Sequence, residues 1–453
     1  MSDSLQVAII GAGPAGIYAA DLLLKTEHKV SIDIFDELPA PYGLVRYGVA
    51  PDHPYIRSIT NALHNVLKQD NLRFFGNVKI GEHVTVAELH EHYDAVVVAT
   101  GANADRSLGI PGEDLPGSMG GADFVSWYDG HPDHPRTWDL SAQEIAVVGV
   151  GNVALDITRM LVKDPQALES TDIPPNVEAG LQENQVRKVH IFGRRGPAQV
   201  KFSLQELREL AACDGVEVRV VPEDMQYDAA STKTVETDRM QRQVVEELEK
   251  LVQAEPVENE APRQVIIHLL SAPTEIYGDG KVEGIRVEKN RLRGDGQVTG
   301  TGEFVDYPVQ AVYRAIGYAS AQVPGLPWDE TEKVIPNAAG RIMHDGTALP
   351  GYYVTGWVKR GPVGLIGSTK SDAKETITCL TEDIEAGKVK ATGAGDGGEG
   401  ILNLLRKRGV RWTTREGWEK LDAYEAQLGE AKGRARTKVV DRETMTAIAR
   451  GEK

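Results

Sequence analysis

Residues 5–36 read LQVAIIGAGPAGIYAADLLLKTEHKVSIDIFD, and this stretch decides the fold. An apolar run over 5–10 ends at a glycine-rich turn, a helical pattern follows over 14–25, and a second apolar run over 30–35 ends at Asp36. A strand, a glycine turn, a helix, a strand and an acidic residue in this order are typical of a βαβ nucleotide-binding unit. We therefore expect a nucleotide at the glycine turn.

The three glycines of GAGPAG have separate tasks in such a unit. Gly11 permits the tight turn, Gly13 lets the backbone approach a pyrophosphate, and Gly16 lets the helix pack closely on the strand. Asp36 would accept hydrogen bonds from an adenosine ribose and repel a 2′-phosphate, which suits FAD better than NADP. Neighbouring Glu37 could take that role instead, or Asp36 could only cap the strand.

The same plan recurs further along the chain. Residues 144–148 form an apolar run, residues 149–154 read GVGNVA and match the pattern GxGxxA, and a second apolar run covers 186–192. The connection over 163–185 is longer than usual and contains three prolines, so we expect a loop and a short helix there. Two such units in one chain indicate two bound dinucleotides.

The end of the second unit differs from the end of the first. Where the first unit has Asp36, the second reads GRRG over 193–196, with Arg194 and Arg195 at its centre. Two guanidinium groups match a 2′-phosphate through charge-assisted, bidentate hydrogen bonds, which favours NADP(H) over NAD(H). A solvated basic turn is the alternative. A flavin site and an NADPH site in one chain indicate hydride transfer between two rings that meet between domains.

The expected fold class is α/β, with two Rossmann-like dinucleotide-binding domains and the NADP domain inserted into the FAD domain. The run YDAVVVATG at 93–101 predicts the strand that closes the first domain, and VQAVYRAIGY at 309–318 predicts its counterpart in the second. The predicted domains are 1–103 with 331–392 for FAD, 104–330 for NADP, and 393–453 for a linker with a helical C-terminal extension.

The extension begins with a change of composition. GAGDGGEG at 393–400 is typical of a linker, and amphipathic helical patterns follow over 401–408, 416–427 and 442–450. The sequence assigns this extension no role.

Composition excludes several classes of protein. The chain has 50 Lys and Arg against 67 Asp and Glu, a formal charge of −17, which disfavours broad binding to nucleic acid or to an anionic membrane. We find no long apolar run and no basic, apolar leader, so we expect a cytoplasmic protein without a membrane span. Cys213 and Cys379 lie too far apart in sequence for a CxxC pair and are too few for a metal cluster. Bound cofactors must therefore carry the electrons.

A glycine-rich segment returns late in the chain. Residues 356–371 read GWVKRGPVGLIGSTKS. Such a turn, with Trp357 beside it, could cover a flavin and offer backbone N–H groups to the edge of its ring system. A tight surface loop is the alternative.

Together these segments resemble the adrenodoxin reductase type of ferredoxin-NADP reductase, in its actinobacterial branch. PYGLVRYGVAPDHP at 41–54 and GRRGPAQVKFSLQELREL at 193–210 are specific to that family, whereas GxGxxG is shared by many flavoproteins. The resemblance covers the chain to about residue 385 through further motifs: GAGPAG at 11–16, RFFGNVKIGEHV at 73–84, IPGEDLPG at 110–117, GNVALD at 151–156 and GWVKRGPVGLIG at 356–367.

The resemblance implies a set of cofactor contacts. For FAD these are Ala15, Asp36, Leu44, Ile80, Trp357, Gly364, Leu365 and Ile366, beside the glycines of the first turn. For NADP they are Gly151, Asn152, Val153, Ala154, Arg194, Arg195 and Glu206, with Gly364 touching both cofactors.

Two titratable residues complete the implied site. The family pattern places His53 of APDHP and Glu209 of ELREL near the nicotinamide and flavin rings. A histidine paired with a carboxylate can hold charge or water beside the flavin and tune its reduction, although hydride transfer needs no general acid. For His53 a helix-capping or packing role is the alternative.

The implied electron acceptor is a ferredoxin or a similar small, acidic iron-sulfur protein, which would dock on basic side chains near the flavin. Solvated faces carry such charges too. The sequence names neither the acceptor nor its pathway, such as one that feeds a cytochrome P450, and it leaves the oligomeric state open, with a monomer plausible. The candidate docking residues are Lys201, Arg208, Lys359, Arg360 and Lys370.

Three other readings compete with this one. A disulfide reductase of the thioredoxin reductase type would need a CxxC pair, and the electron-input subunit of a larger enzyme would be expected to carry cysteine clusters. A non-catalytic flavoprotein that senses NADPH would show one reduction event and no sustained turnover. The reductase is therefore the prediction, and turnover separates it from the sensor.

Overall fold

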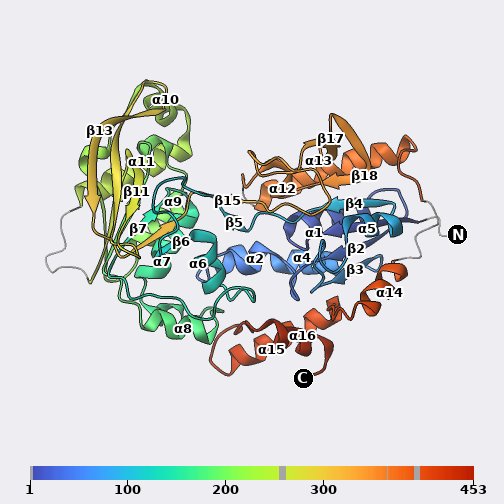
Figure 1. Cartoon of the computed structure of the whole chain (residues 1–453). Helices are drawn as coiled ribbons and strands as arrows, with labels where there is room; N and C mark the ends of the chain where they lie inside the picture. Colours follow the sequence, from blue (N-terminus) through green and yellow to red (C-terminus); the bar gives the residue numbers. More distant parts are fainter. Residues whose placement is uncertain (1–3, 255–261, 365, 392–397) are drawn as a thin grey trace.

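The computed structural model describes residues 4–254, 262–364, 366–391 and 398–453, and two large sheets dominate it (Figure 1). The sheet of the first domain has seven strands in the order β16-β17-β18-β4-β1-β2-β3. The strands from β18 to β3 run parallel, and β16, β17 and β18 are antiparallel to one another. The strands are β1 (Leu5–Ile10), β2 (Val30–Phe35), β3 (Leu72–Phe75), β4 (Ala95–Val98), β16 (Asn337–Ala338), β17 (Arg341–His344) and β18 (Thr347–Val354).

The sheet of the second domain is built entirely from the chain between β4 and β16. Its six parallel strands lie in the order β6-β14-β7-β8-β10-β9. The strands are β6 (Ser118–Gly120), β7 (Glu144–Val148), β8 (Lys188–Phe192), β9 (Val216–Val220), β10 (Arg263–His268) and β14 (Ala311–Arg314). The second domain therefore lies within the first in sequence, as predicted.

Two smaller sheets complete the β structure. An antiparallel sheet of β11 (Ser271–Tyr277), β12 (Gly284–Leu292) and β13 (Val298–Tyr307) packs on the second domain, where Ile276, Ile285 and Val287 join Phe192 in one buried cluster. The short pair β5 (Ala104–Asp105) and β15 (Tyr318–Ala319) holds together the two strands of chain that pass between the domains.

Helices cover the sheets, because strands that are buried on both faces need apolar cover on each side. The first domain has α1 (Pro14–Leu24), α2 (Leu44–Tyr47), α3 (Pro54–Arg57), α4 (Thr60–Leu67), α5 (Val86–His92), α12 (Trp357–Arg360) and α13 (Ile366–Glu385). The second has α6 (Gly121–Tyr128), α7 (Asn152–Val162), α8 (Pro175–Gln182), α9 (Leu204–Ala211), α10 (Ala229–Thr237) and α11 (Arg239–Gln253), with 3-10 turns η1 (Pro165–Leu168), η2 (Pro197–Gln199) and η3 (Pro222–Asp224). The C-terminal helices are α14 (Glu399–Lys407), α15 (Arg415–Glu430) and α16 (Arg442–Arg450).

Most predicted elements form, with shifts of a few residues at their ends. The strand expected over 186–192 begins at Lys188, and the one over 93–101 is confined to Ala95–Val98. The run expected over 309–318 is not one strand, because it breaks at Gly317, whose φ is 115°, and gives β14 and β15. The proline-rich connection forms η1 and α8, as a loop with a short helix predicts. Most of the predicted linker over 393–400 lies outside the described residues.

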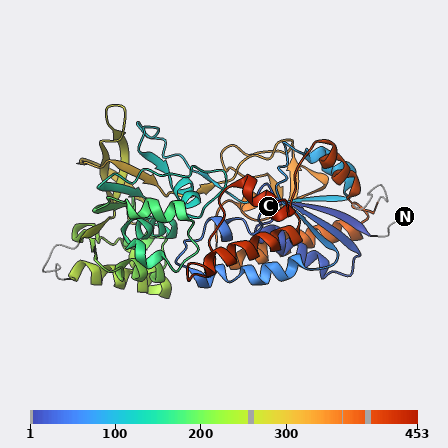
Figure 2. The ribbon, with the colours of Figure 1, turned by 90° about the horizontal axis from the view of Figure 1, so that it is seen from below.

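The helices of the C-terminal extension pack against the first domain and contribute to its hydrophobic core. Ile401, Leu402 and Leu405 of α14 join one buried cluster of the first domain, and Trp418 of α15 and Met445 of α16 join another. Seen from below, α15 runs across the first domain (Figure 2). No helix of the described residues is both long enough and apolar enough to cross a bilayer.

Candidate active site

Two glycine turns with matching geometry lie at the points where the strand order of each sheet reverses. β1 lies between β2 and β4, and β7 lies between β8 and β14. Gly11 has φ of 108°, and a Cβ there would lie 2.4 Å from the carbonyl oxygen of Ala99. Gly149 has φ of 134°, and its Cβ would lie 2.1 Å from the carbonyl oxygen of Ala315. Ligands of such sheets bind at these crossover points.

The third small residue of each motif has the predicted packing role. A Cβ at Gly16 would lie 2.0 Å from the carbonyl oxygen of Gly11, so only glycine fits this helix against its strand. In the second motif Ala154 takes this place and is fully buried.

Both helices that follow the turns begin without a side-chain cap. Gly13 precedes α1 and Gly151 precedes α7, and neither has a side chain that could accept a hydrogen bond from the N–H groups of the first turn. A Cβ at Gly151 would meet nothing within 4 Å, and at Gly13 only the Cα of Gly43 at 4.0 Å. Free N–H groups and a positive dipole end beside open space fit a pyrophosphate. Ala15, Asn152 and Val153 lie in these first turns.

Asp36 follows β2, and its carboxylate spans the first glycine turn. Oδ2 accepts a hydrogen bond from the backbone N–H of Ala12 at 2.7 Å, and Oδ1 accepts one from Leu38 at 2.9 Å. Burial raises the pKa of Asp36 to about 7, although these two hydrogen bonds lower it. Each oxygen keeps a second lone pair that can accept from a ribose hydroxyl. The neighbouring Glu37 is exposed.

The second domain has two basic side chains at the matching strand end. Arg194 is exposed and Arg195 is half-buried, and neither forms a salt bridge among the described residues. Gly193 takes the position of the acid, and a Cβ there would lie 2.7 Å from a methyl of Val150. Two unpaired guanidinium groups at this place fit the 2′-phosphate of NADP.

The late glycine segment lies against the first turn. A Cβ at Gly356, whose φ is 78°, would lie 2.7 Å from the Cβ of Ala15, so the segment returns to the start of α1. Trp357 stacks on Tyr318 of the interdomain strand pair with 6.0 Å between ring centroids. Gly364 is exposed with φ of 90°. Leu365 lies outside the described residues, and Ile366 begins α13.

Two further residues predicted to contact FAD lie around the first domain's site. Leu44 is half-buried and begins α2 directly after Gly43, the residue that faces Gly13. Ile80 is half-buried and packs on the cluster that contains Val98 of β4.

His53 lies at the contact between the domains. It precedes α3, is 5% exposed, and faces α7 and α9 of the second domain. Its Nε2 lies 3.2 Å from Asp156 and 3.3 Å from Glu206, and its Nδ1 lies 3.5 Å from Glu209. The structure thus brings together His53 of APDHP with Glu206 and Glu209 of ELREL, two motifs that lie far apart in the sequence.

The charges around His53 decide its protonation. Burial alone would lower its pKa, but the hydrogen bonds with Asp156 and Glu206 outweigh burial and raise the pKa to about 10. The pKa of Glu206 is lowered, because His53 and Arg159 together outweigh its burial. Glu209 is about one third exposed and accepts a hydrogen bond from Gln205 at 2.8 Å. This raised pKa favours the imidazolium form of His53 at neutral pH. Nη2 of Arg159 lies 2.5 Å from its Nε2, and Glu209 lies on its outer side.

Sequence reasoning missed three charged residues of this cluster. Asp52, Asp156 and Arg159 form its inner side, and Arg159 binds both acids. A signal was available, since Asp156 and Arg159 stand three residues apart in LDITRMLV, an otherwise apolar helix that must pack on a sheet.

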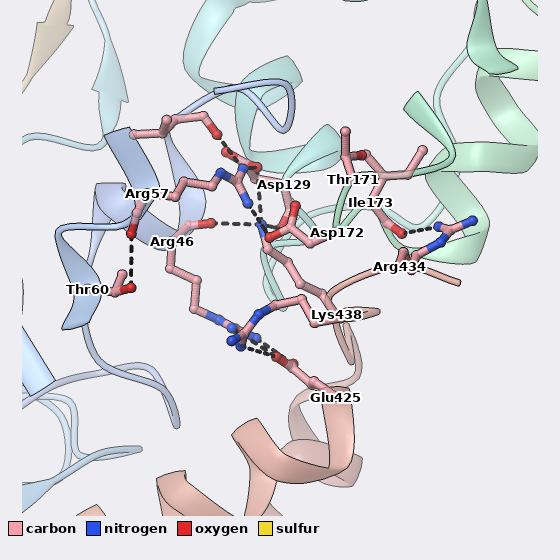
Figure 3. A network of polar contacts seen from close by, with 12 residues as sticks. Arg46, Arg57, Thr60, Asp129, Thr171, Asp172, Ile173, Glu425, Arg434 and Lys438 are labelled. Carbon is pink, nitrogen blue, oxygen red and sulfur yellow. Dashed lines mark hydrogen bonds and ion pairs between the residues drawn. The ribbon is translucent and has the colours of Figure 1, made fainter. Parts of the chain in front are cut away.

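A second polar cluster, here called the interdomain cluster, joins the two domains through the C-terminal segment (Figure 3). Lys438 lies at its centre and donates to the carbonyl oxygen of Arg46 at 2.9 Å and to Asp129 Oδ1 at 3.2 Å. Arg57 binds both Asp129 and Asp172 of the second domain. Its members are Arg46, Arg57, Asp129, Asp172, Glu425 and Lys438. The C-terminal extension therefore ties one nucleotide domain to the other.

One of the predicted docking residues is misplaced. Lys359 is buried, and its ammonium lies 3.1 Å from Asp372 and 2.5 Å from Glu375, so it cannot meet a partner. The reason is that α12 turns this side chain inward onto α13, which a basic surface pattern does not reveal. Arg360 is partly buried and 3.5 Å from Asp372. Arg208 is exposed but paired with Glu247, whereas Lys201 and Lys370 are exposed.

The chain is similar to known proteins along almost all of its length. The family model described as pyridine nucleotide-disulphide oxidoreductase matches residues 5–356. The NADPH-ferredoxin reductase FprA of Mycobacterium leprae (strain TN) is 40% identical over 456 residues, which cover 98% of each chain. The chain belongs to this oxidoreductase family. Its resemblance to ferredoxin-NADP reductases of the adrenodoxin reductase type is thereby confirmed.

Two further relatives extend the comparison. The mitochondrial NADPH:adrenodoxin oxidoreductase of Arabidopsis thaliana is 40% identical over 465 residues, which cover 99% of this chain and 96% of that protein. The structure of Mycobacterium tuberculosis FprA in complex with NADPH superposes with a TM-score of 0.91 at 39% identity, covering 99% of this chain and all of the other. The predicted fold of two dinucleotide-binding domains in this oxidoreductase family is confirmed.

Proposed function

We propose that this oxidoreductase is an NADPH-dependent ferredoxin reductase. The observation that carries the proposal is the pair of matching nucleotide turns, one followed by an acid and the other by two arginines that form no salt bridge with any residue the structure describes. Full-length similarity to reductases of that name supports it. When bound, FAD accepts two electrons with a hydride from NADPH and releases them one at a time to an iron-sulfur protein.

The first domain would hold FAD. The turn with Gly11, Gly13 and Gly16 leaves room for the pyrophosphate at the start of α1, and Asp36 lies where the adenosine ribose binds in such units. Further proposed FAD contacts come from the surrounding segments: Ala15, Glu37, Leu44, Ile80, Trp357, Gly364, Leu365 and Ile366.

The second domain would hold NADP(H). The pyrophosphate would lie on the start of α7, with Arg194 and Arg195 on the 2′-phosphate. Further proposed contacts are Gly151, Asn152, Val153, Ala154, Glu206 and Gly364.

His53 and Glu209 would act where the two cofactors meet. The buried imidazolium of His53, next to the partly exposed carboxylate of Glu209, offers a fixed positive charge and excludes bulk water from the region where the rings would meet. The role we assign to the pair is to stabilise negative charge that develops nearby, while hydride transfer itself needs no proton from either residue.

The electron acceptor would be a small acidic iron-sulfur protein. The exposed Lys201, Arg208 and Lys370 remain candidates for its docking surface, and such a surface would steer association at low salt. A monomer and a cytoplasmic location remain predictions.

The test begins with the absorbance spectrum of the purified protein and anaerobic titration with NADPH and NADH. We expect a flavin spectrum that NADPH bleaches at far lower concentration than NADH does. A protein that binds no flavin after reconstitution would end the proposal. Sustained turnover with cytochrome c through a small ferredoxin is also expected, whereas the alternative, an NADPH-sensing flavoprotein, would show one bleaching event and no flux.

A further inference from the structure

We propose that Arg159 is a positioning residue that keeps Asp156 and Glu206 from capturing the His53 ring, so that the ring stays oriented with Nδ1 toward Glu209. This inference rests on the role of His53 in the proposed function.

Arg159 is a buried charge with an unusual number of acidic partners. It lies on α7, and only 1% of the residue is exposed. Its Nε donates to Asp52 at 2.8 Å, its Nη1 to Glu206 at 2.8 Å, and its Nη2 to Asp156 at 2.6 Å. A planar guanidinium can serve three carboxylates in this way, whereas a lysine offers one point charge.

Arg159 and His53 share the same acceptor atoms. Oδ1 of Asp156 lies 2.6 Å from the guanidinium but 3.2 Å from His53 Nε2, and Oε2 of Glu206 lies 2.8 Å from the guanidinium but 3.3 Å from His53 Nε2. The guanidinium therefore takes the shorter bond to each oxygen. His53 keeps the longer bonds to the carboxylates, its Nε2 lies 2.5 Å from Nη2 of Arg159 itself, and its Nδ1 remains 3.5 Å from Glu209 on the other side.

The charged residues that meet here belong to different domains. Asp52 and His53 are neighbours in the first domain, and Arg159 binds Asp52 through both Nε and Nη2, at 2.8 and 3.1 Å. Lys163, which follows the last residue of α7, also binds Asp52, at 2.9 Å. These hydrogen bonds to Asp52 fix the backbone next to His53. Arg159 therefore positions His53 both through this backbone and through the carboxylates near the ring.

The charges that face His53 fix the sign of the effect. Asp52 precedes it, Asp156 and Arg159 come from α7, Lys163 directly follows α7, and Glu206 and Glu209 come from α9. Arg159 lowers the pKa of His53, against the two carboxylates that raise it. Loss of Arg159 frees Asp156 and Glu206 for Nε2, which raises the pKa of His53 further. If the substitution only disrupted the site and exposed the ring to solvent, His53 would instead titrate near the ordinary pKa of histidine.

The test follows the His53 ring by NMR from pH 7 to 10.5 in holoprotein labelled at histidine, with His53→Gln to assign the signal. We expect Arg159→Met to move the midpoint up by one unit or more, so that most of the change leaves this range. Arg159→Lys, which retains one charge, should give a smaller upward shift. A midpoint that stays or falls in both variants overturns the inference. Arg341→Met, which removes another multiply paired guanidinium, is the matched control and should leave the signal in place.

A double-mutant cycle adds a kinetic readout. Arg159→Met should slow flavin bleaching by NADPH by roughly tenfold, and in the His53→Gln background it should cause no further loss. Independent losses that multiply would mean that Arg159 acts on structure alone. If His53→Gln by itself leaves the rate unchanged, the assigned role of His53 fails, while the NMR midpoint still decides what Arg159 does to the ring.

Discussion

Replacement of Lys438 by methionine should loosen the contact between the two domains. The ammonium is almost fully buried and meets the carbonyl oxygens of Arg46 and Asp129, at 2.9 and 3.1 Å, besides the carboxylate of Asp129. Without it, Arg57 is the cation that remains in contact with both Asp129 and Asp172 among the described residues. Removal of one partner from a buried charge pair costs about 3–5 kcal/mol, because the other charge stays buried without compensation.

The loss should appear as local opening, which hydrogen exchange followed by mass spectrometry measures. A loss of about 3 kcal/mol corresponds to exchange roughly 100-fold faster in peptides that cover residues 434–442. Asp129→Asn in the same chain removes the uncompensated charge, so the double variant should lose less than the sum of the two single variants. Unchanged exchange in Lys438→Met, or additive losses, would show that the interdomain cluster does not hold these segments together.

Three further predictions concern other parts of the chain. Replacement of Arg194 and Arg195 together by glutamine should weaken use of NADPH far more than use of NADH in steady-state kinetics, and equal losses would show that they do not bind the 2′-phosphate. Burial, with the charge of a neighbouring histidine, lowers the pKa of His268 to about 3. Its folded pKa lies below the unfolded one, so its contribution to stability is complete above pH 6.5 and is lost as pH falls toward 3; His268→Gln should therefore show a smaller drop in Tm between pH 7 and 4. Lys359→Gln should lower Tm and leave the salt dependence of ferredoxin reduction unchanged, whereas Lys370→Gln should do the reverse if docking uses that face.

Local signals in the sequence were sufficient for the nucleotide turns. Gly11 and Gly149 occupy backbone conformations that favour glycine, and each must approach a carbonyl of a neighbouring strand. These backbone requirements fix the spacing of the glycines in the sequence. The strand, the turn and the helix could therefore be placed to within a few residues. The acid after one strand and the arginines after the other are equally local.

The contacts between distant segments could not be predicted in this way. Asp52 and Arg159 are 107 positions apart, and Lys438 meets Asp129 across 309 positions. A charged residue in a helix shows that a partner must exist, but not which segment supplies it. The prediction of Lys359 as a docking residue was wrong for the same reason, since the inward direction of its side chain depends on how α12 packs on α13.

The proposed function requires that two nucleotide sites, one in each domain, open toward each other beside His53. A crystal structure of the protein with both FAD and NADP⁺ bound would show whether they do. We predict that the nicotinamide and isoalloxazine rings stack at about 3.5 Å, the separation at which reacting atoms can meet. Rings held apart by protein side chains, with both cofactor sites fully occupied, would mean that hydride cannot pass between them.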